Sequence, residues 1–166
     1  MDKLHWTKGL FRNRLTVRRG NEQVGVIDWN NFFSSDALAT INGHRFLLNR
    51  DFFLSKLEIS DATTQALLAT IMINLFNPKG DLVLNGKRFE LEIKNFWQSR
   101  WSWKYNGQEI IVFQSQEFLT KDSGTIEIYT ADTEELEVLI LLGLFVRNQL
   151  VLFMVFLLFV VLFMLM

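Results

Sequence analysis

The last seventeen residues of the chain, Leu150–Met166, contain no polar side chain. The apolar run begins upstream at Leu136 and is interrupted only by Glu137, Gly143 and the triplet Arg147-Asn148-Gln149. A helix that is apolar on all sides has to be buried in protein or in lipid. The tail therefore indicates a structural or membrane-associated protein.

Upstream of the tail, apolar and polar residues alternate with a period of two, as in antiparallel strands that have one buried and one solvent-exposed face. Asn-Gly, the strongest short-range hairpin signal, occurs at residues 42–43, 85–86 and 106–107. In residues 88–93, apolar side chains alternate with charged ones. We expect about twelve strands, at roughly 4–8, 10–19, 23–29, 36–41, 44–49, 55–60, 65–75, 81–84, 87–93, 100–105, 108–114 and 117–129.

Two stretches of the chain resemble each other. NGHRFLLN at residues 42–49 matches NGKRFELE at 85–92, and RDFFLSKLEIS at 50–60 matches KNFWQSRWSWK at 94–104. The similarity indicates two related halves of one sheet system. The alternative is chance similarity between two hairpins with the same turn.

A sheet of about twelve strands avoids exposed edges by closing into a barrel, and such a barrel has more room than its own side chains fill. A helix about 10 Å across with an apolar surface fits that space. Glu134–Val146 supplies it, with Glu134 and Glu135 in the first turn, where negative charge suits the helix dipole. The sequence thus predicts a mainly β protein, a closed antiparallel barrel around a hydrophobic C-terminal helix.

Short strands, two similar halves and the segment LEVLILLGLF at residues 136–145 together resemble the tubby C-terminal-like superfamily. That group includes the tubby proteins, the LURP-one-related proteins and the phospholipid scramblases. The resemblance implies a twelve-stranded barrel around a hydrophobic C-terminal helix and covers nearly the whole chain. The apolar tail beyond Leu150 departs from it.

The apolar stretch from Leu136 to Met166 would be about 46 Å long as one helix, whereas the bilayer hydrocarbon core is about 30 Å thick. A span centred on Arg147 would cost roughly 2.5–3.5 kcal/mol for the cation. We therefore expect a barrel domain at residues 1–149, with 134–149 as its central helix, and a transmembrane anchor at 150–166. Arg147 would flank the membrane interface, and the barrel would lie on the cytoplasmic side.

Two other divisions of the tail remain open at this stage. Residues 136–166 could form one long helix buried entirely in the protein. Alternatively, the barrel could lack a central helix and the entire tail could lie in the membrane.

Few residues suited to catalysis are present. The absence of cysteine excludes disulfides and thiolate sites, and the two histidines, His5 and His44, are far apart in sequence. No phosphate-binding or nucleophile motif occurs, and Glu90 and Glu92 alternate with apolar residues as on a solvated strand face. We expect no enzyme, cofactor or metal, and the net charge of −1 gives no general attraction to nucleic acid.

The basic N-terminal hairpin is the candidate site for lipid head groups. Its cations are Lys8, Arg12, Arg14, Arg18 and Arg19. Each basic residue near an anionic leaflet contributes about 1 kcal/mol to binding. Tubby proteins bind phosphoinositides through basic residues of the barrel, so the resemblance implies a similar role without assigning it to particular positions. The alternative is an ordinary charged surface.

A second cluster is aromatic and consists of Trp97, Trp101, Trp103 and Tyr105. It could stack on a ligand or form a membrane-interface belt. Alternating aromatic residues more often pack in a core, here against the central helix, and we favour that interpretation.

These observations predict a non-catalytic, membrane-associated barrel that binds lipid head groups, anionic phospholipid among them, or a protein partner at the membrane surface. One alternative is a scramblase-like lipid transfer protein. Another is a soluble β-barrel carrier whose whole tail is buried core.

Overall fold

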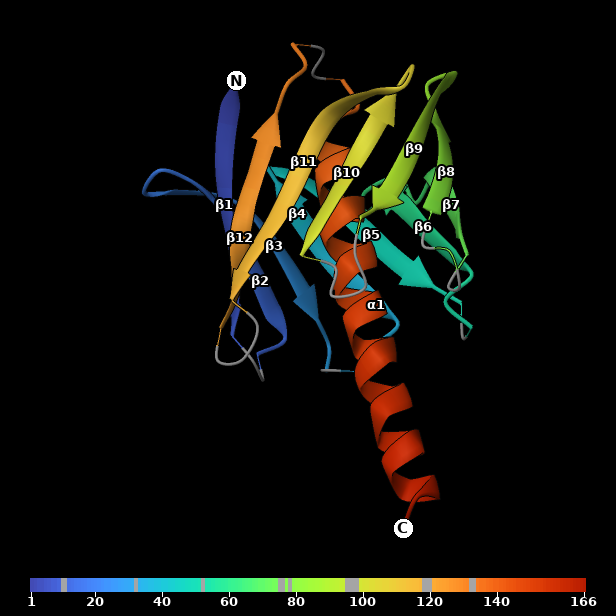
Figure 1. The fold of residues 1–166 in the computed structure, drawn as a ribbon. Coiled ribbons are helices and arrows are strands. Elements are labelled where there is room, and N and C mark those ends of the chain that lie inside the picture. Colours follow the sequence, from blue (N-terminus) through green and yellow to red (C-terminus); the bar gives the residue numbers. More distant parts are fainter. Residues whose placement is uncertain are drawn as a thin grey trace.

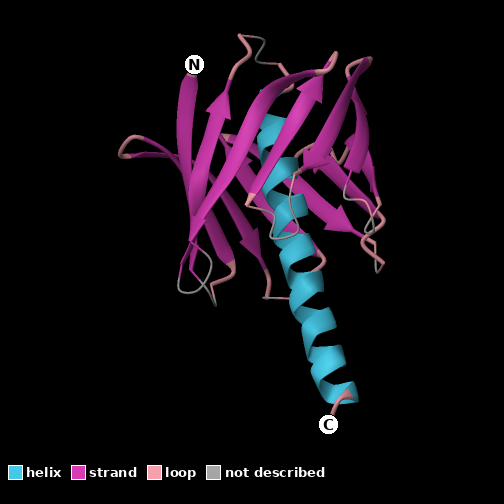
Figure 2. Ribbon diagram, viewed as in Figure 1, coloured by secondary structure: helices cyan, strands magenta, loops and turns pink. Residues whose placement is uncertain are grey.

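The computed structural model describes residues 1–9, 12–31, 33–51, 53–74, 77, 79–94, 99–117, 121–131 and 134–166. Within these residues the chain forms a closed barrel of twelve antiparallel strands around a single C-terminal helix (Figures 1 and 2). Strands that follow each other in sequence are hydrogen-bonded neighbours, and β1 closes the barrel by pairing with β12. The predicted fold class is confirmed.

The strand bounds follow the expected pattern closely. The elements are β1 Asp2–Gly9, β2 Arg14–Arg19, β3 Glu22–Trp29, β4 Asp36–Ile41, β5 His44–Arg50, β6 Lys56–Asp61, β7 Leu67–Ile73, β8 Lys79–Leu84, β9 Lys87–Ile93, β10 Arg100–Tyr105, β11 Gln108–Glu117, β12 Lys121–Ile128 and the helix α1 Leu136–Met164. The larger differences are the start of β2, at Arg14 rather than 10, the end of β11, at Glu117 rather than 114, and the start of β12, at Lys121 rather than 117.

The three Asn-Gly pairs form the tight turns that their sequence predicts. Asn42, Asn85 and Asn106 have φ values of 48°, 50° and 49°, and each following glycine also has a positive φ. Two consecutive residues with positive φ are the requirement of the hairpin turn that matches strand twist. These turns join β4 to β5, β8 to β9 and β10 to β11.

The internal repeat is visible in the strands. The bounds of β4 and β5 reappear 43 residues later as those of β8 and β9. The bounds of β6 reappear 44 residues later as those of β10, in agreement with the one-residue insertion between the matched segments. The two halves of the sequence repeat therefore occupy equivalent successive positions in the barrel wall.

Helix α1 is continuous over 29 residues and about 44 Å long. Its side chains are buried in the barrel from Val138 to Leu150 and again at Leu152, whereas those from Phe156 to Phe159 and from Val161 onward are exposed. Figure 1 shows the first part of α1 inside the barrel and its C-terminal part projecting from one end. This corrects two alternatives: the whole tail is not buried core, and the barrel does not lack a central helix.

Two tryptophans fix the helix inside the wall. Trp101 Nε1 donates to the Gly143 carbonyl at 3.0 Å, and Trp103 Nε1 donates to the Leu139 carbonyl at 2.7 Å. Both side chains are fully buried, so the core interpretation of this cluster is confirmed for them. Trp97 lies outside the described residues.

Candidate functional site

The barrel has two chemically different ends. We call the end where α1 emerges the mouth; the bond between Arg50, at the end of β5, and Gln149 of the helix marks it. Six strand connections belong to the mouth, and the sequence of each contains phenylalanine. The connections at the opposite end, which include the three Asn-Gly turns, contain neither Phe nor Trp. Two phenylalanines of these connections are among the described residues: Phe33 and Phe53 lie at the mouth and are 69% and 74% exposed.

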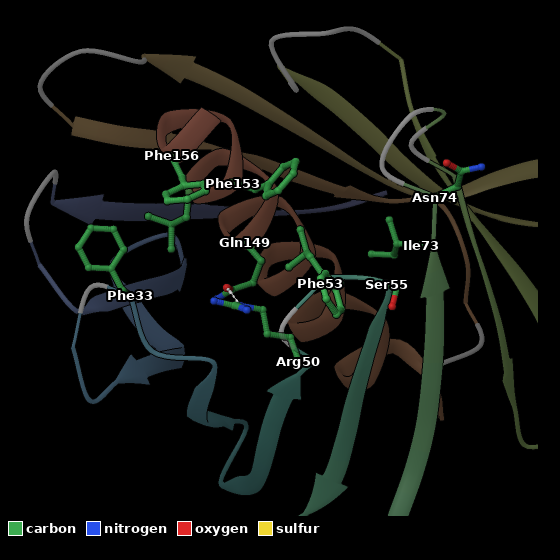
Figure 3. A pocket seen from close by; sticks show the side chains of 11 residues that line it. Phe33, Arg50, Phe53, Ser55, Ile73, Asn74, Gln149, Phe153 and Phe156 are labelled. Carbon is green, nitrogen blue, oxygen red and sulfur yellow. Dashed lines mark hydrogen bonds between the residues drawn. The ribbon is translucent and has the colours of Figure 1, made fainter. Parts of the chain in front are cut away.

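A pocket of about 850 Å³ opens beside the helix at the mouth (Figure 3). Its size is typical of sites for small organic ligands. It is lined by Phe33, Arg50, Phe53, Leu54, Ser55, Ile73, Asn74, Gln149, Leu152, Phe153 and Phe156. Most of this lining is apolar, so the four polar side chains define where a polar group of a ligand would lie.

Arg50 and Gln149 form the polar base of this pocket (Figure 3). Arg50 Nε donates to Gln149 Oε1 at 2.6 Å, and Arg50 Nη1 donates to the Asp51 carbonyl at 3.1 Å. Because a guanidinium cannot accept, the bond fixes which end of the Gln149 amide is oxygen. The other end, Nε2, is buried without a hydrogen-bond partner among the described residues, and Gln149 as a whole is 1% exposed.

The five basic residues predicted from the N-terminal hairpin do not form one patch. Lys8 is next to the last residue of β1, Arg14 is the first of β2 and Arg12 lies between the two strands, so these three are toward the mouth. Arg18 and Arg19 are at the opposite end of β2. Arg14 pairs with Asp28 through two contacts, and Arg19 Nη2 lies 2.8 Å from Asp2 Oδ2. Arg18 donates to the Asn21 carbonyl.

Lys8 points into the barrel, whereas a residue that binds lipid head groups would have to be exposed. It is 8% exposed, and its Nζ lies 5.3 Å from the ring centroid of Trp29. Burial lowers the pKa of Lys8, because desolvation penalises the ammonium more than the nearby carboxylate of Asp122 stabilises it.

Arg147 is also inside the barrel and is 3% exposed. Its guanidinium pairs with Asp122 of β12 and donates to Ser115 Oγ of β11. The same guanidinium lies 5.2 Å from the ring centroid of Trp6 and 5.5 Å from that of Trp101. The barrel wall therefore neutralises this cation just above the mouth.

At the opposite end, polar side chains of the wall hold the start of α1. Asn42 Nδ2 and His44 Nδ1 lie 2.8 and 2.6 Å from the two carboxylate oxygens of Glu137. Asn85 and Lys87, their equivalents in the repeat, contact Glu135 at 3.2 and 3.3 Å. His44 is thus part of a helix clamp, and the described residues contain no cluster of three acidic or histidine side chains suited to a metal.

Sequence reasoning missed Arg50 and Gln149 as pocket residues. A signal for Gln149 was available, because it is the last polar residue before seventeen apolar ones. Arg50 offered none, since it is 99 residues away and meets Gln149 only through closure of the barrel.

Comparison of the chain with protein-family models, with curated proteins and with solved structures found no match. The resemblance to the tubby-like superfamily stays a prediction. By length and composition α1 meets the requirement for a membrane span, a requirement that the core helix of a soluble protein can also meet; 44% of its apolar window is buried in the barrel.

Proposed function

We propose that this chain is a non-catalytic, membrane-anchored β-barrel whose mouth rests on the bilayer and contacts lipid. The observation that carries the proposal is the coincidence of two apolar features at one end of the barrel. The exposed half of α1 leaves through the mouth, and the exposed rings of Phe33 and Phe53 stand beside its exit. A contiguous apolar surface of this kind is typical of a membrane or protein contact.

The part of α1 outside the barrel favours close contact between the mouth and lipid. From Val151 to Met164 this part contains no polar side chain, so no polar linker separates the barrel from the apolar segment. When this segment enters the bilayer, the mouth rests at the surface, with Phe33 and Phe53 at the level of the head groups, where aromatic side chains are favoured.

Charge supports a cytoplasmic barrel. Arg12 and Arg14 lie at the mouth end, next to the expected membrane surface. Basic residues that flank a span favour the cytoplasmic side and are attracted to its anionic lipids. The buried pair of Arg147 with Asp122 lets the helix carry a cation close to the membrane without exposing it to hydrocarbon.

The test is carbonate extraction of the full chain beside the variant Phe159→Lys/Leu162→Lys. Both positions are exposed and lie beyond the barrel, so the core is untouched. We expect the unaltered chain to stay in the membrane pellet and the lysine variant to leave it, because each lysine at mid-bilayer costs about 2.5–3.5 kcal/mol. The matched control, Phe159→Leu/Leu162→Phe, should behave as the unaltered chain. Release of the unaltered chain would contradict the anchor.

A further inference from the structure

We propose that the mouth pocket holds one membrane phospholipid, with its phosphate and ester oxygens at Arg50 and Gln149 and its acyl chain along α1 toward the bilayer. This inference rests on the proposed function and adds to it a specific ligand class and site.

Unused hydrogen-bond donors at the base of the pocket call for a ligand rich in acceptors. Gln149 Nε2 is buried and has no partner among the described residues. Arg50 uses two of its five N–H groups in the bonds to Gln149 and to the Asp51 carbonyl. Phosphate and ester oxygens accept hydrogen bonds and donate none, so they complement this base.

The positive charge of Arg50, at the bottom of the pocket, is also available to a ligand. Both acceptors that Arg50 contacts are neutral, an amide oxygen and a backbone carbonyl. The carboxylate of Asp51, the nearest acid in sequence, is instead bonded to the backbone N–H groups of Ser55 and Lys56 and to the Ser55 hydroxyl. An anionic phosphate at Arg50 would therefore meet a cation that no carboxylate of the described residues neutralises.

The wall of the pocket continues into the membrane span. Gln149, Leu152, Phe153 and Phe156 are spaced as i, i+3, i+4 and i+7, so they share one face of α1. Figure 3 shows Phe153 and Phe156 on the helix beyond Gln149, with Arg50 next to Gln149. A lipid in this pocket thus has its polar part deep in the barrel mouth and its chain on the apolar face that enters the bilayer, the orientation that it already has in a leaflet.

Ligand binding is tested with the full chain in non-ionic detergent, titrated with dioctanoyl phosphatidylglycerol and followed by native mass spectrometry. Arg50→Gln is compared with Arg45→Gln, the same change at an exposed position of β5 outside the pocket. We expect one lipid per chain for the unaltered protein and for Arg45→Gln. Arg50→Gln should bind about tenfold to a hundredfold more weakly, the range for a lost hydrogen bond to a charged group.

A second pair of variants tests the apolar wall and covers the case in which Arg50→Gln fails to fold. Phe153→Ala removes a pocket ring, and Phe163→Ala removes an exposed ring beyond the barrel. Only Phe153→Ala should weaken binding, by several-fold. Glycerol phosphate, which has the anion without a chain, should not displace the lipid; full displacement would overturn the lipid assignment.

Equal lipid binding by all folded variants, or none by the unaltered chain, would overturn the proposal. Because carbonate extraction is measured separately, that result is distinguishable from failure of the anchor. A chain that stays in the membrane without a retained lipid refutes the pocket ligand only, and a chain released by carbonate refutes the proposed function.

Discussion

His44 Nδ1 lies 2.6 Å from Glu137 Oε2, so a hairpin of the barrel wall is bonded to the first turn of the helix inside it. Asn42, in the same turn, donates to the other oxygen of that carboxylate. The equivalent turn of the repeat holds Glu135 through Asn85 and Lys87. Two copies of one motif thus fix the start of α1, and this sets how far its C-terminal half extends from the mouth.

This clamp predicts a stability that depends on pH. Glu137 raises the pKa of His44 above 6.5, through a hydrogen bond and through its charge. A raised pKa in the folded state means that the contribution is complete below the unfolded value of about 6.5 and is lost as pH rises through the folded value. We expect the melting temperature of the full chain in detergent to fall over that interval, and His44→Asn to remove this component. His5→Asn, at the other histidine, is the control; equal pH profiles for both variants would contradict the clamp.

The environment of Glu109 predicts a second pH-dependent contribution to stability, one that is lost in acid. Arg100 first, then Lys94 and the hydroxyl of Ser102, hold the pKa of Glu109 at about 2, below its usual 4.5. The depressed value means that this stabilisation is present above about pH 4.5 and is lost as pH falls toward about 2.

Glu109→Gln should therefore lower the unfolding free energy at neutral pH by about 1–2 kcal/mol, after allowance for solvent screening, and flatten the acid limb of the stability curve. Chemical denaturation across the acid range measures both effects. Glu90→Gln, at an exposed position of β9, serves as the control. An unchanged acid limb in Glu109→Gln would refute the assignment.

We predict that α1 fits against the barrel wall only with glycine at position 143. A Cβ added there would lie 2.5 Å from Phe113 Cζ, and the Phe113 ring is stacked on Trp101 at 5.1 Å. Overpacking costs about 1–3 kcal/mol, whereas alanine gains about 1 kcal/mol in helix propensity. We expect Gly143→Ala to destabilise the protein by about 1 kcal/mol in thermal unfolding. Adding Phe113→Leu should relieve the clash, so non-additivity in the double variant is the decisive result.

Arg147 and Asp122 are predicted to stabilise the barrel as a pair. Arg147→Met leaves the half-buried carboxylate of Asp122 without its arginine partner, and breaking a buried pair in this way costs about 3–5 kcal/mol. The double variant Arg147→Met/Asp122→Asn should recover part of that loss, because the carboxylate left without Arg147 is removed as well. Recovery is incomplete because the buried ammonium of Lys8 then loses the stabilising charge of Asp122. Unfolding in denaturant measures the coupling, and additive effects of the two substitutions would show that the pair does not interact.

Local patterns in the sequence were sufficient for much of the fold. Alternation with period two and three Asn-Gly turns predicted the strands, and Trp101 and Trp103 were correctly expected to pack on the helix. The candidate site was less accessible to this reasoning. Lys8, Arg14 and Arg18 share a short hairpin in sequence, yet Lys8 points inward while Arg14 and Arg18 lie on its outer face toward opposite ends of the barrel.

The sequence by itself determined that Leu150–Met166 needs an apolar environment and that the upstream chain alternates as a sheet, because both properties are carried by neighbouring residues. Only the tertiary structure decided where burial of the helix ends and which polar groups meet there. Arg50 reaches Gln149, and Asp122 reaches Arg147, because barrel closure and the clamp at Glu135 and Glu137 fix the depth of α1. That depth is a long-range property, set by contacts between residues far apart in the chain, and local periodicity does not encode it.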